Sequence, residues 1–376
     1  MIQVDGHYML LHAWALWALQ AEDTPEKAAF IEESWPTVSA YASYFINDQY
    51  IDSALKLVRN PNYEHTGAGG GMIETYDLIT NAFMSQALHE LSTIAQQRGD
   101  KEQADLWKKT SELIVEGVEE NLVMTASGKE IYAELLNNKK ELSTGLSFVS
   151  WGPVAAEWYG INSERMANTY EIYRKYGSLE FGNISMLNIY FDLKSNKRSN
   201  HVVGKAVAWE LMYNRAIGDE ERVEELLTFM RENSTPGGVY PENWVVDGRI
   251  SDVGNQEQVS WILYAMIKLF PQLTVDPSAP ESSDPSSPNV SSSVSDSSSQ
   301  VGSHISDPGN SSVQAPTSAA SQDDSSHSVT QSAVGSEPES DSPVTGHTIG
   351  ILSALLAAIS AMCVVAFRNK TGKQPG

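Results

Sequence analysis

The sequence predicts an all-α domain, in which about nine helices form antiparallel pairs that close into an α-hairpin toroid. Apolar residues recur at helical spacing through residues 1–271, and no convincing strand alternation appears. Every Trp and Tyr precedes residue 265, so the folded part is expected to end near there. Residues 1–271 are therefore interpreted as one domain that can bury a sizeable core.

The first helix is expected within residues 1–20, where apolar residues follow i, i+3, i+4, i+7 spacing: Leu10, Ala13, Trp14 and Trp17. A second begins at Thr24-Pro25, an N-cap followed by Pro at the first helical position, and Pro36 should kink it. The remaining helices are expected from Tyr76 to Gly99, from Asp100 onward, and near 147–159, 163–176, 201–217, 219–233 and 255–270.

Composition divides the rest of the chain. Residues 272–342 are rich in Ser, Pro, Asp, Gln and Gly and are expected to form a disordered stalk. Residues 349–367 are uncharged, apolar and long enough for one transmembrane helix, and the basic residues after them place the C-terminus in the cytoplasm. Residues 1–271 hold 38 acidic and 22 basic residues, a net charge of −16, and would be repelled by phosphate backbones, so nucleic-acid binding is not expected.

The segment 343–376 begins with Pro343, Val344, Thr345 and Gly346, then continues with the apolar span and a basic tail. This order resembles the sortase sorting signal of Gram-positive surface proteins, although Ser342 replaces the usual Leu. The resemblance implies sortase and peptidoglycan as partners, cleavage between Thr345 and Gly346, and an extracellular, surface-anchored domain. A plain single-pass anchor is the alternative. Residues 1–20 lack the basic region of a signal peptide, so we expect this sequence to be the C-terminal part of a longer protein.

Three groups of residues resemble the six-hairpin glycosidases, the (α/α)6 barrels that include glucoamylases and trehalases. They are Gln3-Val4-Asp5-Gly6, then Trp35-Pro36 with Tyr41 and Tyr44, and finally Pro241-Glu242-Asn243-Trp244 with Asp247-Gly248 and Ser260-Trp261. The resemblance implies exo-acting, inverting hydrolysis of an oligosaccharide by two carboxylates. It also implies that the first three helices of the toroid lie outside this sequence, so we expect little activity from the chain alone.

Counting helices backward from the last places five residues at or before the starts of even-numbered helices: Asp5, Glu64, Trp151, His201 and Glu242. In this family the even-numbered helices form the inner ring, and the loops at their N-terminal ends shape the pocket. The resemblance therefore implies a general acid before helix 6 and a general base before helix 12.

Glu242 is the predicted base, because it follows a Gly-Pro turn that should be exposed. Tyr240 and Trp244 flank it and could stack on sugar faces. A helix-entry carboxylate without a catalytic role is the competing interpretation. Glu257 is the rival base, but it should lie inside the last helix.

Glu64 is the predicted acid, because Tyr63-Glu64-His65 is similar to the family's aromatic-Glu element and a Gly-rich loop follows it. Burial against Tyr63 would suit a general acid. Glu74 and Asp77 are the alternatives. The predicted substrate-binding residues are Asp5, Tyr63, His65, Trp151, Tyr240 and Trp244.

Three other functions stay open: a glycoside phosphorylase, a non-catalytic glycan-binding surface protein, and a pseudoenzyme on the same toroid. The first would need a basic phosphate pocket, and Lys205 and Arg215 form no evident cluster. Neither a cofactor nor a metal is expected, since the histidines lack ligand spacing and the only cysteine, Cys363, lies in the apolar span.

Overall fold

The computed structural model describes residues 5–63, 73–235, 239–251 and 253–270. The predicted stalk, transmembrane span and sorting signal lie outside these residues. Within the described residues, no helix combines the length and the apolar character that a membrane span requires.

Helices dominate the described residues, as the sequence predicts. The nine α-helices are α1 (Asp5–Gln20), α2 (Pro25–Tyr44), α3 (Leu78–Gln97), α4 (Lys101–Asn121), α5 (Gly152–Ala155), α6 (Glu164–Gly177), α7 (Gly204–Ile217), α8 (Glu220–Asn233) and α9 (Gln256–Leu269). Side-chain caps begin most of the long helices: the predicted cap Thr24 accepts from Lys27 N on α2, and Asp100 accepts from Gln103 N on α4. The predicted helix ranges are therefore confirmed, with one exception.

The exception is the helix expected at 147–159. The chain there forms two 3-10 turns, η1 (Phe148–Trp151) and η2 (Tyr159–Asn162), on either side of the single-turn α5. Gly152 lies so close to α3 that a Cβ would be 2.7 Å from Ile79 Cα. Glu157, with a φ of 50°, then turns the chain away. Close packing and a left-handed residue thus override the apolar periodicity.

Short strands connect the helices, which the sequence did not predict. They are β1 (Ile51–Asp52), β2 (Leu57–Val58), β3 (Asn60–Tyr63), β4 (Ile73–Asp77), β5 (Val123–Ala126), β6 (Lys129–Tyr132), β7 (Leu135–Asn137), β8 (Gly145–Ser147), β9 (Ser178–Phe181), β10 (Ile184–Leu187), β11 (Tyr190–Asp192), β12 (His201–Val203), β13 (Asn243–Val245) and β14 (Ile250–Ser251). They pair antiparallel as β1–β2, β3–β4–β7, β5–β6, β8–β11, β9–β10 and β12–β13–β14. Strands of two to five residues are too short to show a clear alternation.

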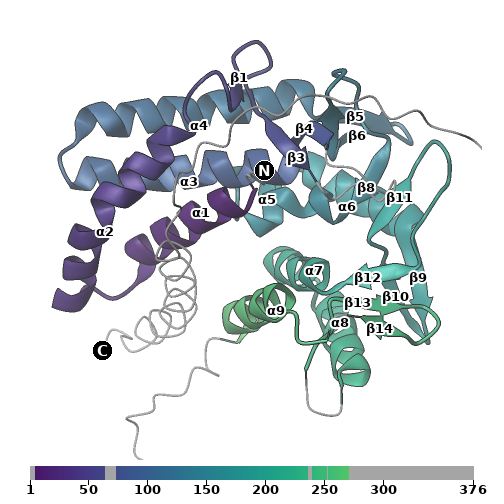
Figure 1. The fold of residues 1–376 in the computed structure, drawn as a ribbon. Coiled ribbons are helices and arrows are strands. Elements are labelled where there is room, and N and C mark those ends of the chain that lie inside the picture. Colours follow the sequence, from purple (N-terminus) through teal and green to yellow (C-terminus); the bar gives the residue numbers. More distant parts are fainter. Residues whose placement is uncertain (1–4, 64–72, 236–238, 252, 271–376) are drawn as a thin grey trace, which may run out of the picture. The chain divides into compact units, whose positions relative to one another are not determined.

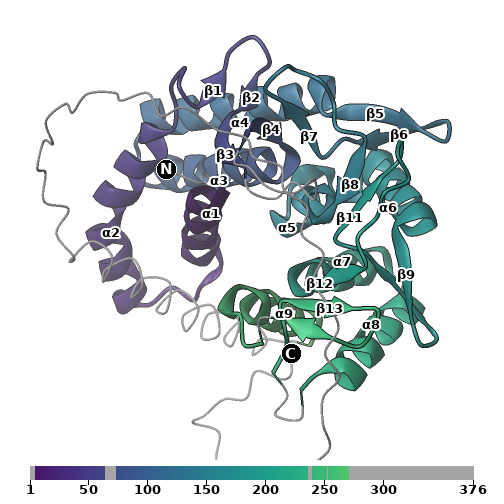
Figure 2. The same ribbon diagram turned by 45° about the vertical axis from the view of Figure 1, so that its right-hand side comes forward.

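The helices form two layers. In the first layer, α1, α3, α5, α7 and α9 contact one another in chain order, although each is separated from the next by another element. In the second layer, α2, α4 and α8 each pack on the first-layer helix that precedes them, as Figure 1 and Figure 2 show for α4 on α3. This is the predicted arrangement of helix pairs. The closure of the pairs into a toroid stays a prediction.

The first-layer helices α3, α5, α7 and α9 begin at the same end. Gly152 at the start of α5 touches Ile79 at the start of α3. Lys205 at the start of α7 lies over the ring of Phe148, which precedes α5, at 4.8 Å. The Lys205 backbone N–H also donates to Gln258 Oε1 at the start of α9, at 2.6 Å. Loops that enter these helices are therefore brought together, although they are far apart in sequence.

A buried ion pair fixes α8 on α7. Arg222 and Glu210 are each 2% exposed, and Arg222 Nε donates to Glu210 Oε1 at 2.9 Å. The Tyr170 hydroxyl of α6 donates to the same oxygen at 2.9 Å. Three helices therefore meet at one carboxylate.

Replacing Arg222 with Met should lower the free energy of unfolding by about 3–5 kcal/mol, because Glu210 would be left buried without its cation. Arg215→Met is the control, since the exposed pair of Arg215 with Glu220 should contribute about 0–1 kcal/mol. Urea denaturation measures both. Equal losses of unfolding free energy in the two variants would contradict a stabilising role for the buried Arg222–Glu210 pair.

A second buried pair joins α1 to α3, with His12 Nδ1 2.8 Å from Glu90 Oε2. Burial opposes protonation of His12, but Glu90 and then Glu157 outweigh both burial and Lys268 and raise the pKa of His12 above its usual 6.5. The folded state therefore binds this proton more tightly than the unfolded state does.

The stabilisation from the His12 proton should be fully present below pH 6.5 and lost as the pH rises through the raised pKa of the folded state. His12→Gln should remove this part of the pH dependence. Denaturant midpoints measured from pH 5 to pH 9 test this, and the idea is wrong if the parent and His12→Gln lose stability in parallel.

Candidate functional site

Glu242, the predicted base, is fixed through its backbone where α7 and α9 begin. Its carbonyl accepts from the Gly204 N–H at 2.9 Å, and its N–H donates to the Ser251 carbonyl at 3.0 Å. The following strand, β13, pairs with β12, which leads directly into α7. The position of Glu242 is therefore set by the start of one helix and by the sheet in front of it.

The Glu242 side chain is half-buried and is held at the start of α9. Asn255 Nδ2 donates to Glu242 Oε2 at 2.8 Å. Asn255 is also the N-cap of α9, where its Oδ1 accepts from the N–H groups of Glu257 and Gln258. Because the N-terminal end of a helix carries partial positive charge, it favours an anion at this place.

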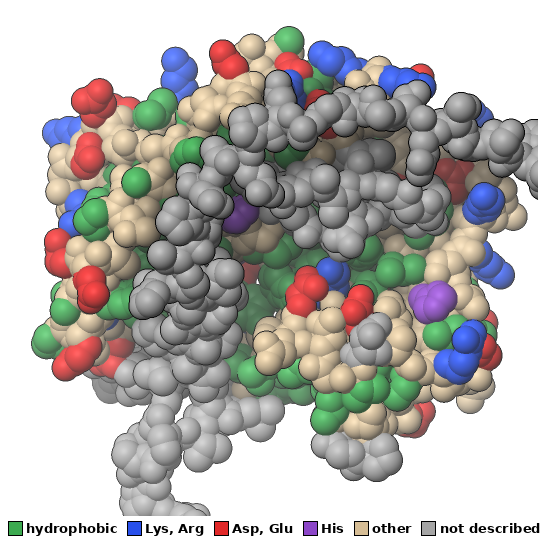
Figure 3. All heavy atoms as spheres, in the orientation of Figure 1, with side chains coloured by type: hydrophobic (Ala, Val, Ile, Leu, Met, Phe, Trp, Pro, Cys, Tyr) green, Lys and Arg blue, Asp and Glu red, His purple; other side chains and the backbone are tan. Residues whose placement is uncertain are grey.

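A basic group lies beside these residues. Lys205 Nζ donates to Glu257 Oε1 at 2.8 Å, with the Lys205 side chain 9% exposed and that of Glu257 47% exposed. Glu257 is the second residue of α9, inside the helix as the sequence predicts. We name this group the α7–α9 junction; it comprises Gly204, Lys205, Glu242, Asn255, Glu257 and Gln258. Figure 3 shows acidic and basic side chains together over α7 and α9, beside a hydrophobic area.

The junction depends on a glycine. A Cβ on Gly204 would lie 3.2 Å from both Gln258 Cβ and the Pro241 carbonyl oxygen. These distances are tighter than ordinary contact, so a larger residue would force the start of α9 or the Glu242 loop to shift. Gly204 thus lets the two helix starts and the loop approach one another.

The structure does not describe the predicted acid, Glu64. Glu64 and His65 lie outside the described residues, and of Tyr63 only its place at the end of β3 is described. The alternative Glu74 is exposed, with its Oε1 3.4 Å from Arg59 Nε. Within the described residues, the structure therefore does not establish which carboxylate is the acid that acts with Glu242.

The second alternative acid, Asp77, is the N-cap of α3. Its carboxylate is fully buried and caps α3 by accepting from the Thr80 N–H at 2.7 Å. It also accepts from Thr80 Oγ1 at 2.9 Å and from Asn60 Nδ2 at 3.0 Å. A carboxylate that is enclosed and hydrogen-bonded in this way cannot reach a substrate as it lies, so its geometry does not favour a catalytic role.

Two predicted sugar platforms are core residues. Trp151 is 1% exposed and packs on Tyr170 and Tyr213. Trp244 is 2% exposed, packs on Phe229 and donates its indole N–H to the Asn233 carbonyl at 2.9 Å. Because neither ring is accessible, stacking on a sugar is incompatible with their positions, and we correct both assignments to core packing.

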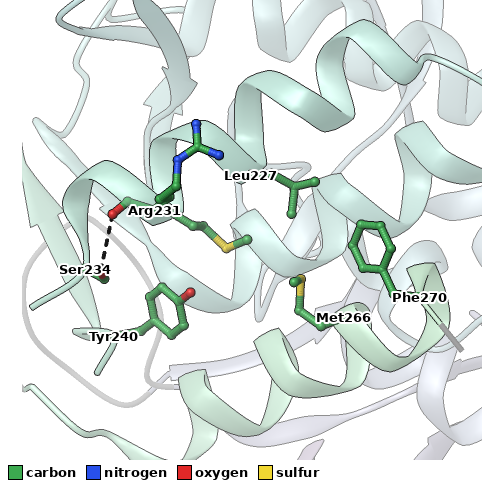
Figure 4. Close-up of a pocket in the computed structure, with 7 residues that line it drawn as sticks. Leu227, Arg231, Ser234, Tyr240, Met266 and Phe270 are labelled. Carbon is green, nitrogen blue, oxygen red and sulfur yellow. Dashed lines mark hydrogen bonds between the residues drawn. The ribbon is translucent and has the colours of Figure 1, made fainter. Parts of the chain in front are cut away.

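Tyr240 and Asp5 remain from the predicted binding residues. Asp5 is the first residue of α1, and only its backbone is described. Tyr240 is partly buried and points into a groove of about 560 Å³ between α8 and α9, shown in Figure 4. The groove is lined by Leu227, Met230, Arg231, Ser234, Tyr240, Met266 and Phe270. Tyr240 is thus accessible from a largely apolar surface.

The sequence interpretation missed Asn255, Gln258 and Glu134. Asn255 before a periodic segment is a recognisable N-cap signal, but its contact with Glu242 could not be read from spacing. Glu134 is buried near the start of α3, where its carbonyl accepts from the Leu78 N–H. Burial raises the pKa of its carboxyl group, against hydrogen bonds from Ser143 and Ser147. No sequence signal marks Glu134, which is 5% exposed.

Among the described residues, no three His, Cys, Asp or Glu side chains gather as metal ligands would. The charged groups that meet at the junction are instead two carboxylates and one ammonium group, held by helix starts. Such an arrangement can bind polar groups and transfer a proton through Glu242.

No protein-family model matches this sequence, and no curated protein matches it. Among solved structures, it is similar to a bacterial glucoamylase in complex with acarbose, with 14% identity, a TM-score of 0.43, and coverage of 52% of this chain and 33% of the other. A metal-independent α-mannosidase from Streptococcus pneumoniae has 14% identity, a TM-score of 0.43, and coverage of 58% and 51%. A sugar epimerase from a ruminal bacterium has 12% identity, a TM-score of 0.46, and coverage of 72% and 70%.

The chain thus spans about a third of the glucoamylase and half of the mannosidase. These proteins include glycosidases as well as a sugar epimerase. Likeness at this level assigns neither a substrate nor a reaction.

Gly204→Ala should lower the free energy of unfolding by about 1–3 kcal/mol through overpacking at the junction. Gly6→Ala is the matched control: Gly6 lies in the first turn of α1, where an added Cβ meets nothing within 4 Å, so the variant should lose no stability. Thermal and urea unfolding measure both. A neutral Gly204→Ala would show that the two helix starts are not tightly packed.

Proposed function

We propose that the chain is a surface-anchored glycoside hydrolase that cleaves oligosaccharides by inversion, with Glu242 as the general base. One observation carries the proposal: a partly buried carboxylate that still reaches solvent is held where helix starts meet, with one oxygen bound to a neutral amide. A general base needs a fixed carboxylate that still reaches solvent, because it must take a proton from water in the reacting geometry.

The surroundings of Glu242 suit this role. Lys205 donates to Glu257. Within the described residues, the Glu242 carboxylate accepts its hydrogen bond from the uncharged amide of Asn255. A direct ion pair with Lys205 would stabilise the charged carboxylate and make it a weaker base. The sequence resemblance around Pro241-Glu242-Asn243-Trp244 supports the same assignment.

Glu64 is the proposed general acid, with Glu74 as the alternative. The third candidate acid, Asp77, is not proposed, because its carboxylate is buried and caps α3. In an inverting enzyme the acid would lie about 6.5–9.5 Å from Glu242, leaving room for the attacking water.

The proposed location follows from the sequence alone. A transmembrane helix at 349–367 would hold the chain in the membrane until a sortase cleaves between Thr345 and Gly346, releases the helix and joins Thr345 to peptidoglycan; without cleavage, the helix itself would be the anchor. The Ser/Pro-rich segment would hold the domain away from the surface. The domain would then act on carbohydrate outside a Gram-positive cell.

A hydrolysis screen of the full-length gene product against a panel of oligosaccharides tests the function. The parent should release a monosaccharide, and Glu242→Gln should lower kcat about 10²- to 10⁴-fold while it stays folded. Glu112→Gln is the matched control: Glu112 is an exposed carboxylate on α4, and its replacement should leave turnover unchanged.

Two outcomes would contradict the proposal. If the parent binds oligosaccharides without turnover, a glycan-binding role replaces hydrolysis. If Glu242→Gln is as active as the parent and Glu257→Gln is not, the base is Glu257.

A further inference from the structure

Asn255 uses both ends of one amide group. Its Oδ1 accepts from the Glu257 N–H at 3.0 Å and from the Gln258 N–H at 3.4 Å, which caps α9. Its Nδ2 donates to Glu242 Oε2 at 2.8 Å. The cap fixes the orientation of the amide, because a flipped group would point its NH₂ at two backbone donors and its oxygen at a carboxylate.

Capping alone does not explain an asparagine at this position. Ser and Asp cap helices about as well as Asn does. Neither could serve Glu242 in the same way: an ionised Asp has no proton to donate and would repel the carboxylate, and the short Ser side chain cannot reach in both directions. Of these three caps, only Asn carries its neutral donor and its cap acceptor on two different atoms that point in different directions.

The contact also leaves one carboxylate oxygen for chemistry. Oε2 of Glu242 is held by Asn255, while the structure gives Oε1 no hydrogen bond within the described residues. When a hydrogen bond holds one carboxylate oxygen, the direction in which the other oxygen points is also fixed. Because Asn255 is the N-cap of α9, this direction is tied to a rigid helix rather than to the loop that carries Glu242.

We propose that Asn255 is a positioning residue that aims the Glu242 carboxylate by hydrogen bonding from the N-cap of α9. The inference rests on the proposed function for its catalytic meaning, but the contact itself can be tested without turnover. Asn255 would not touch substrate; it would act through Glu242.

The test uses two variants that keep the cap, Asn255→Ser and Asn255→Asp, and follows the Glu242 carboxyl carbon by NMR as the pH is changed. Loss of the donor should raise the midpoint of the Glu242 titration by about one pH unit in Asn255→Ser, and by more in Asn255→Asp, where a second carboxylate faces it. Asp100→Ser, a cap replacement on α4, is the matched control and should leave the midpoint unchanged.

Turnover is measured on the same proteins. Asn255→Ser should lower kcat about tenfold with little change in KM, and the acid limb of its pH–rate profile should move to higher pH. Thermal unfolding midpoints near that of the parent would show that the helix start is intact.

The outcomes separate this inference from the proposed function. An unchanged Glu242 midpoint in both cap-retaining variants overturns the positioning role, whatever the activity. A raised midpoint supports the positioning contact even if Glu242→Gln retains full turnover, a result that would overturn the proposed base alone.

Discussion

The close approach of the starts of α7 and α9 is the constraint on which the site depends. Gly204 has no side chain, so its backbone N–H reaches the Glu242 carbonyl while Gln258 packs beside it. The same approach lets Gln258 accept from the Lys205 N–H. Helix starts leave backbone donors unpaired, and here these donors are satisfied by side chains and loop carbonyls from other elements. A carboxylate, an amide and an ammonium group are thereby gathered from three segments of the chain.

Much of the helical fold could be predicted from the sequence, because local signals determine it. The cap at Thr24, the stop at Gly99 and the cap at Asp100 depend on neighbouring residues, and the structure confirms all three. The prediction of one helix at 147–159 was wrong because the conformation there depends on contact with Ile79 of α3, which is far away in sequence. The fourteen short strands were missed because each is stabilised by a partner strand rather than by its own pattern.

The candidate site was predictable only in part. The turn before Glu242 was expected to be exposed; Val239 is exposed, but Pro241 is buried and the Glu242 residue is partly buried. Gly237 and Gly238 lie outside the described residues. Accessibility of the aromatic residues could not be predicted, since Trp244 and Trp151 are buried by α8, α6 and α7, which the sequence does not place around them. The hydrogen bond between Asn255 and Glu242 likewise depends on tertiary packing.

The most direct test of the account is a crystal structure of the chain with an oligosaccharide that it binds. If Glu242 is the base, a sugar oxygen or an ordered water should lie within hydrogen-bonding distance of Glu242 Oε1, with Asn255 still bound to Oε2. An oligosaccharide seated in another part of the molecule, with Glu242 facing only solvent, would contradict the assignment of the α7–α9 junction as the active site.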